Sequence, residues 1–332
     1  MKVLDMHCDT ISVLLRQKRE GKDVSLRENK GHLDLLRMND SGYLLQNFAL
    51  FVNSGSGCDP WEEVCALQAL YQEELTRNAD IIAPVLSYED IAANEAQGQL
   101  SAMLTVEEGA VCKGEVKKLR RIYDMGVRMM TLTWNHPNEI GFPNLNSARE
   151  DEKDFLYIAD NVNGLTERGR EMVTVMEELG MIVDVSHLSD AGFYDVAECT
   201  KKPFVASHSN ARSICRCVRN LTDDMLRVLG ERGGCTGLNY CPDFLKEVPF
   251  GERNPGTVAA IVEHAKHIVN VGGMDILGLG SDFDGIDGHA ELQGVQSMEL
   301  LWDALHKGGF NQAQLDKIFH GNVLRVYRDT LK

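Results

Sequence analysis

Histidine and acidic residues recur where short apolar runs of this sequence end. The first run, "VLDMHCDT" (3–10), contains His7 and Asp9, which would point to the same side of a strand because side chains alternate along it. Later runs end in a similar way. Their polar groups are Glu107 and Glu108 in "TVEE", His187 in "DVSH", His208 in "VASH" and Asp282 in "SDFD". Imidazoles and carboxylates bind metals and transfer protons, so the pattern indicates metal or acid–base chemistry.

Each of these groups alone has a structural explanation. A single histidine at a strand end is more often a hydrogen-bonded structural residue, and the acidic pairs would suit a turn or a helix start. Together they favour a metal centre, because so many ionisable groups buried at one place are costly unless a cation compensates them. They exceed the ligands of one tetrahedral zinc and suit two Zn²⁺ ions with a bridging carboxylate, or alternatively Mn²⁺ or Co²⁺.

Such a metal centre requires a fold in which the ends of several strands lie close together. The sequence alternates apolar or β-branched runs with segments of helical spacing such as 60–78 and 165–180. The predicted strands are 2–9, 44–52, 100–108, 127–134, 181–187, 203–209, 234–240 and 276–284. This order predicts a (β/α)₈ TIM-type barrel as one domain over residues 1–332, with a long irregular loop at about 135–164. A doubly wound open sheet is the rival, but no glycine-rich nucleotide-binding turn follows the first run.

Composition narrows the class of protein. The formal net charge of −16 argues against a nucleic-acid partner, and no Lys/Arg stripe contradicts that. The apolar runs are too short for a membrane span, and the N-terminus lacks the pattern of a secretory signal. The nine cysteines have no framework spacing, which suits reduced thiols. We therefore expect a cytoplasmic protein without a membrane partner.

The motifs resemble those of the renal (membrane) dipeptidase family. In order and spacing they are "DMHCDT", "TVEEGA", "DVSHLS", "VASHSNAR", "VRNLTDD" and "GLGSDFDG", and the resemblance continues to "GNVLRVY" (321–327). It implies a (β/α)₈-barrel metallopeptidase with two zinc ions that hydrolyses dipeptides. The family also implies a possible homodimer and tolerance for a D-residue at the second position of the substrate.

Roles follow from the resemblance position by position. His7 and Asp9 match the ligands of one zinc, and His187 and His208 those of the other. Glu107 matches the bridging carboxylate, with Glu108 standing where the family has a glycine. For the substrate, Arg219 in "VRN" matches the arginine that binds the C-terminal carboxylate, and Asp282 matches the acid beside the leaving amine.

One position departs from the family pattern. Trp134 in "TLTWNHPN" stands where the animal enzymes have a histidine that holds the carbonyl oxygen. His136 or Asn135 would then supply this contact, and Tyr240 is a further substrate-binding candidate.

The expected reaction is hydrolysis of a dipeptide by a hydroxide that bridges two zinc ions. Two alternatives stay open at this point. The first is another binuclear-metal hydrolase, acting on a lactone, a cyclic amide or a phosphoester. The second is a barrel that binds a metal or a ligand without catalysis.

Overall fold

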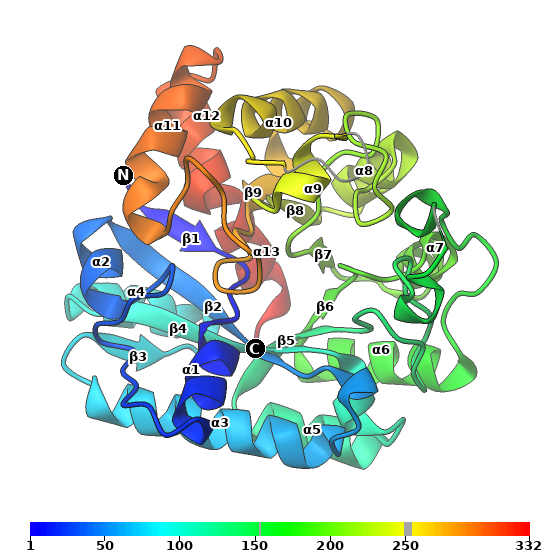
Figure 1. The fold of residues 1–332 in the computed structure, drawn as a ribbon, viewed down its shortest axis with the longest axis horizontal. Coiled ribbons are helices and arrows are strands. Elements are labelled where there is room, and N and C mark those ends of the chain that lie inside the picture. Colours follow the sequence, from blue (N-terminus) through cyan, green and yellow to red (C-terminus); the bar gives the residue numbers. More distant parts are fainter. Residues whose placement is uncertain (153, 249–253) are drawn as a thin grey trace.

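A closed parallel barrel forms the centre of the molecule (Figure 1). The computed structural model describes residues 1–152, 154–248 and 254–332. Its strands are β1 Val3–Asp5, β2 Tyr43–Phe51, β3 Ile82–Pro84, β4 Leu100–Glu107, β5 Val127–Thr131, β6 Ile182–Asp184, β7 Val205–Ala206, β8 Cys235–Leu238 and β9 Leu277–Leu279. Adjacent strands pair in the order β2-β1-β9-β8-β7-β6-β5-β4, and a parallel pairing of β2 with β4 closes the barrel. The predicted (β/α)₈ barrel is confirmed.

Each of the eight barrel strands lies within or overlaps a predicted run. Strand β3 was not predicted; it has only three residues and ends in Pro84. It pairs with the first residues of β4, on the same edge of β4 that pairs with β5 further along. Proline lacks the N–H of a central strand, so this short pairing lies at the margin of the barrel.

Helices surround the barrel (Figure 1). Among the described residues they are α1 Thr10–Arg19, α2 Leu35–Asp40, α3 Pro60–Arg77, α4 Tyr88–Ala96, α5 Val116–Asp124, α6 Glu167–Leu179, α7 Asp190–Cys199, α8 Asp223–Glu231, α9 Pro242–Leu245, α10 Val258–Gly272, α11 Met298–Lys307, α12 Gln312–Asp316 and α13 Asn322–Thr330. Sequence signals fix several ends. Asp59 caps α3 by accepting from the Trp61 and Glu62 N–H groups, and α6 stops at Gly180 in the left-handed region, at φ 80°.

Helix α13 packs against the barrel interior. Its Val323, Val326 and Tyr327 form one apolar cluster with Ile182, Val205 and Cys235, the first residues of β6, β7 and β8. Tyr327 also hydrogen-bonds Asn47 of β2, with 2.7 Å between the Tyr327 Oη and Asn47 Nδ2 atoms. The end of the barrel at which the strands begin is therefore filled, and the opposite end is left for a site.

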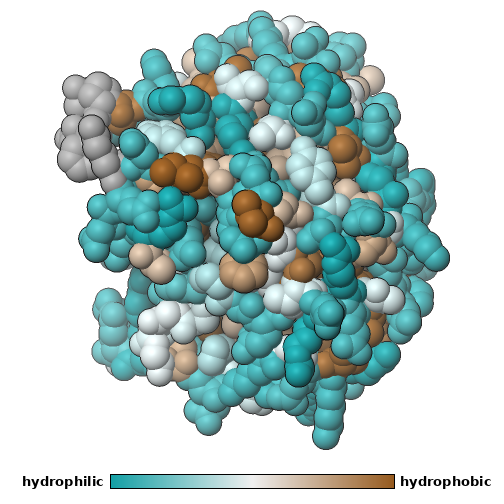
Figure 2. Space-filling model, turned by 90° about the vertical axis from the view of Figure 1, so that its right-hand side faces the viewer, coloured by the Kyte–Doolittle hydropathy of each residue, from teal (hydrophilic) through white to brown (hydrophobic). Residues whose placement is uncertain are grey.

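The predicted loop 135–164 is irregular over its described residues, with 3₁₀ turns at Ser147–Arg149 and Phe155–Tyr157; residue 153 lies outside the described part. All nine cysteines are free. In the described ranges, no helix is both long and apolar enough to cross a bilayer. The face drawn in Figure 2 is mainly hydrophilic with scattered hydrophobic residues. Dimerisation and a cytoplasmic location stay predictions.

Candidate metal centre and active site

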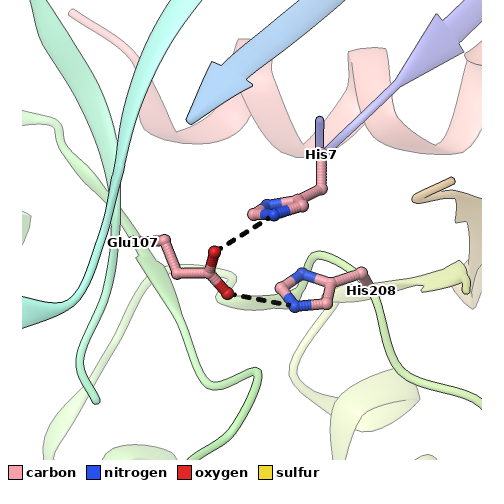
Figure 3. Close-up of side chains that lie close together, drawn as sticks. All are labelled: His7, Glu107 and His208. Atoms are coloured by element: carbon pink, nitrogen blue, oxygen red, sulfur yellow. Dashed lines mark ion pairs between the residues drawn. The ribbon is translucent and has the colours of Figure 1, made fainter. Parts of the chain in front are cut away.

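The barrel brings the predicted ligands together at the carboxyl ends of its strands. Glu107 is the last residue of β4, and the other groups lie shortly after β1, β6, β7 and β9. These groups are His7, Asp9, His187, His208 and Asp282. Figure 3 shows one carboxylate oxygen of Glu107 facing His7 and the other facing His208. Parallel strands that start at one end of a barrel must finish at the other, so residues far apart in sequence meet there.

The two carboxylate oxygens of Glu107 face different partners. Its Oε2 lies 3.3 Å from His7 Nε2. Its Oε1 lies 3.0 Å from His187 Nε2 and 3.4 Å from His208 Nε2. A carboxylate placed in this way can bridge two cations, one on each side.

The hydrogen bonds behind His187 and His208 fix where their lone pairs lie. His187 Nδ1 lies 2.9 Å from the Asn135 Oδ1, which only accepts. His208 Nδ1 lies 2.7 Å from Ser207 Oγ, and that hydroxyl donates its own proton to Asp184 Oδ2 at 2.6 Å. Both rings therefore carry their proton on Nδ1 and a lone pair on Nε2.

These two lone pairs face each other, because the Nε2 atoms of His187 and His208 are 3.1 Å apart. With Glu107 Oε1 at the same place, three electron-rich atoms converge and no proton lies between them. Such an arrangement is repulsive unless a cation sits among the three atoms. The donor set of two imidazole nitrogens and one carboxylate oxygen fits zinc.

The other side of Glu107 holds a second group of donors. His7 Nε2 is buried without a hydrogen-bond partner in the described structure, and it lies 3.4 Å from Asp9 Oδ2 and 3.9 Å from Asp282 Oδ1. The ligand atoms of His7, Asp9 and Asp282 all lie within 4.8 Å of one another. Asn239 Nδ2 donates to the remaining Asp282 oxygen at 3.0 Å and orients that side chain. This donor set also fits a divalent cation.

Burial and mutual charge set the protonation of the cluster. Burial lowers the pKa of His187 to about 4, with a further contribution from the Arg219 charge. Burial alone would raise the pKa of Glu107, but the surrounding histidines hold it well below its ordinary range. Burial raises the pKa of Asp9 to about 6 and that of Asp282 to about 7. At neutral pH, Glu107 is thus ionised and His187 neutral, which are the forms that bind metals.

A cavity of about 570 Å³ opens onto the cluster. Its walls include Asp9, Glu107, His187 and Asp282 together with Phe51, Trp134, Asn135, Arg219 and Phe244. Arg219 is only 3% exposed, and its Nε has no hydrogen-bond partner among the described residues. Its NH groups make only long contacts of 3.4 Å, to Ser209 Oγ and His208 O. Arg219 is therefore a buried cation with donors left for an anionic ligand.

Two sequence-predicted residues are not brought to this cavity. His136 lines a separate cavity of about 330 Å³ beside Gly55 and Lys113. The chain turns there because Asn138 Nδ2 hydrogen-bonds Glu108 Oε1 and Leu132 O. Tyr240 is fully buried in the core. Its ring packs edge-on against Phe283 and its Oη approaches Met298 Sδ, at 3.9 Å. The structure therefore does not bring these two predicted contacts to the cavity at the ligand cluster, whereas Asn135 and Trp134 do line it.

Glu108 points away from the cluster. Its carboxylate accepts from the Ala110 N–H and from Ser54 Oγ as well as from Asn138. Its φ of 110° lies in the region that favours glycine, which is the residue that the family has at this position. The acid that can bridge is therefore Glu107.

Three residues that support the ligands were not predicted from the sequence: Asp184, Ser207 and Asn239. Asp184 accepts from the Ser207 hydroxyl behind His208, and its other oxygen accepts from the Ser186 and Ser207 N–H groups. An acidic residue inside the apolar run "MIVDVSH" was a usable signal, because an unpaired buried carboxylate is costly. Nothing in the spacing of Ser207 or Asn239 distinguishes either from other polar residues.

Comparisons with known proteins agree with this geometry. The family model for membrane dipeptidase (peptidase family M19) matches residues 1–332. An uncharacterized Klebsiella pneumoniae protein of the pqqA 5′ region is 33% identical over 270 residues, covering 81% of this chain and 95% of that one. Mouse Dipeptidase 3 is 30% identical over 332 residues, covering 98% of this chain and 64% of the mouse protein.

Two solved structures share the barrel. The dipeptidase AC, a metallopeptidase of family M19, superposes with a TM-score of 0.89 at 26% identity and covers 100% of this chain and 99% of its own. A Rhodobacter sphaeroides metallopeptidase, liganded with a phosphinate mimic of the dipeptide L-Ala-D-Ala, has a TM-score of 0.86 at 24% identity, covering 99% of each chain. Since the family model extends over the whole sequence, the chain belongs to the membrane dipeptidase family, peptidase family M19.

Proposed function

We propose that this protein is a dipeptidase that hydrolyses the peptide bond of dipeptides with two divalent cations, zinc by the chemistry of its donors. The observation that carries the proposal is the placement of Glu107, whose two oxygens face two separate groups of ligand atoms. Bound there, the cations supply the Lewis acidity that activates water and polarises the peptide carbonyl. His187 and His208 would hold one cation. His7 and Asp9 would hold the other.

Arg219 would bind the C-terminal carboxylate of the substrate. Its guanidinium is buried at the cavity wall and keeps unused N–H donors, and a carboxylate is the anion that such a planar fork pairs with best. A binding site for the free C-terminus this close to the ligand cluster would leave space for one residue beyond the scissile bond. The site would then accept dipeptides and reject longer peptides.

Asp282 would deliver a proton to the leaving nitrogen. Its Oδ1 faces the ligand cluster from the cavity wall, and Asn239 holds its Oδ2 in place. A positioned carboxyl group of this kind is suited to general acid catalysis. We include dipeptides with a D-residue at the second position, because the related Rhodobacter sphaeroides enzyme binds a mimic of L-Ala-D-Ala.

The test measures metal content and hydrolysis of L-Ala-L-Ala and L-Ala-D-Ala by the wild type, Glu107→Gln and Glu108→Gln. We expect about two zinc ions per chain and dipeptide turnover in the wild type. Glu107→Gln keeps the shape but loses the bridging charge, so metal content and kcat should fall, kcat by at least about 100-fold. Glu108→Gln is the matched control, since its side chain lies outside the cluster.

Other outcomes would redirect the assignment. Bound metal without dipeptide turnover in the wild type would favour a lactone, a cyclic amide or a phosphoester as substrate. A wild-type protein that binds no divalent metal would contradict the assignment of the cluster as a metal centre.

A further inference from the structure

Asn135 occupies a position between the candidate metal centre and the open cavity. It follows Trp134 after the end of β5, and both residues line the cavity. Its Oδ1 lies 2.9 Å from His187 Nδ1, on the side of the ring away from Glu107. Asn135 therefore contacts a ligand histidine and also borders the space that a substrate would fill.

The tautomer of His187 determines which way the Asn135 amide faces. His187 must keep its lone pair on Nε2 to hold a cation with His208 and Glu107, so its proton is on Nδ1. That N–H needs an acceptor, which the Asn135 Oδ1 provides. The Nδ2 group is then turned away from the ring, and it has no hydrogen-bond partner among the described residues. Because Asn135 lines the cavity, these two N–H groups can donate to a ligand bound there.

The support behind His208 is different. Its Nδ1–H is accepted by Ser207 Oγ, which donates to Asp184, and all three groups are buried. Neither Ser207 nor Asp184 lines the cavity, whereas Asn135 does. Of the two histidines on this side of Glu107, only His187 is thus oriented by a residue that a substrate can reach.

The chemistry of a dipeptide limits what these donors can bind. The α-ammonium group carries only donors, and in the proposed function Arg219 takes the carboxylate. The remaining strong acceptor is the carbonyl oxygen of the scissile bond. This oxygen gains negative charge as the bond is attacked, so a donor fixed beside it stabilises the transition state more than the bound substrate.

We propose that Asn135 has two roles: it is a positioning residue that holds His187 in the metal-binding tautomer, and it donates a hydrogen bond from Nδ2 to the carbonyl oxygen of the bound dipeptide. The second role rests on the proposed dipeptidase function, whereas the first requires only a bound cation. Asn135, rather than His136, would thus supply the contact to the carbonyl oxygen.

Two substitutions separate the roles. Asn135→Ala removes the acceptor for His187 and the donors for the substrate. Asn135→Asp keeps the acceptor and removes the donors. Asn146→Asp is the control, because Asn146 lies in the same loop and its side chain only accepts from the Ala148 N–H, as an aspartate also can.

The first readout is metal binding by the protein freed of metal, titrated with Co²⁺ and with Zn²⁺ against a chromophoric chelator. Asn135→Ala should weaken the affinity of one of two cations about 10- to 100-fold and alter the Co²⁺ absorption bands. Asn135→Asp should restore wild-type affinity or exceed it, which also shows that the fold is intact. Wild-type affinity in Asn135→Ala would overturn the positioning role.

The second readout is hydrolysis of L-Ala-L-Ala at saturating Zn²⁺. Both Asn135 variants should lose about 10- to 100-fold in kcat with a smaller change in KM, because the donor acts mainly in the transition state. A wild-type kcat in Asn135→Asp would overturn the donor role. If the wild type itself hydrolyses no dipeptide, the proposed function and the donor role both fail, while the metal titration still decides the positioning role.

Discussion

Arg219 combines two properties that are rarely found together in a single residue: it is almost completely buried, and it has no acidic partner within salt-bridge distance in the described structure. The neighbouring Arg212 shows the usual solution, a bidentate pair with Asp190. Burial lowers the pKa of Arg219, yet an arginine stays charged in proteins. A buried cation with free donors is unfavourable for the fold by itself and becomes useful when an anionic ligand binds.

Substitution of Arg219 by lysine should therefore change substrate selection. A lysine keeps the charge but cannot form a bidentate pair, so we expect kcat/KM for L-Ala-L-Ala to fall about 10- to 100-fold. The wild type should have a much higher kcat/KM for L-Ala-L-Ala than for the same dipeptide with a C-terminal amide. Arg219→Lys should reduce this difference in kcat/KM. Arg216→Lys is the control, since Arg216 is exposed and pairs with Glu247. If the ratio of kcat/KM for the acid to kcat/KM for the amide is unchanged in Arg219→Lys, Arg219 does not bind the substrate carboxylate.

Among the elements, helix α10 contacts the segment 211–221, which contains Arg219, through a buried histidine. Its His264 is fully buried and bonds two other parts of the chain. Nδ1 accepts from the Ala211 N–H at 3.1 Å, and Nε2–H donates to Leu245 O at 2.9 Å. Ala211 in turn pairs with Leu221, just beyond Arg219. The neutral ring is required for this bridge, because protonation of Nδ1 would remove the acceptor.

This bridge predicts a pH dependence of stability. Burial lowers the pKa of His264 to about 4 from its ordinary 6.5, so below pH 6.5 the unfolded chain binds more protons than the folded one. The stabilisation by neutral His264 is complete above pH 6.5 and is lost as the pH falls towards 4. The corresponding decrease between pH 7 and pH 5 is about 2 kcal/mol.

Urea unfolding of the wild type and His264→Gln at pH 7 and pH 5 measures this effect. Glutamine can still accept and donate but does not titrate in this range, so the stability difference between the two proteins should shrink by about 2 kcal/mol at pH 5. The other titrating groups contribute equally to both proteins. A difference that is the same at both pH values would show that His264 does not carry the effect.

The strands of the barrel were predictable from the sequence because each is a short, nearly continuous apolar run. The location of the candidate site was predictable because a barrel brings the carboxyl ends of its strands together. The two predicted contacts that the structure does not bring to the cavity lie outside the strands. His136 leaves the site because Asn138 anchors the chain to Glu108 and Leu132, contacts that no local pattern encodes. Tyr240 turns inward, where Phe283, from the segment that follows β9, packs against it. Long-range contacts decide both positions, and a pattern of neighbouring residues cannot report them.

At the scale of the whole molecule, the ligand cluster joins parts of the chain that only the closed barrel brings together. Its residues run from His7 after β1 to Asp282 after β9, and they come from five strands. The protein carries a net charge of −16, so the converging carboxylates add repulsion to an already acidic chain. Cations bound at the cluster relieve this repulsion in the folded state. The unfolded chain does not hold these ligands together, so cations stabilise it much less than they stabilise the folded state.

Removal of the metal should consequently destabilise the whole fold. A ligand that binds only the folded state and is present at about 100 times its Kd stabilises that state by about 2.7 kcal/mol. For a chain of this size, this corresponds to a Tm lower by about 4 °C after chelation. Calorimetric melting before chelation, after it, and after Zn²⁺ is added back measures the change, with metal content determined on each sample. Glu107→Gln should show a smaller shift, because it has lost the bridging carboxylate. If metal-free and reconstituted wild type have the same Tm, the cluster binds metal without stabilising the barrel, which would contradict this prediction.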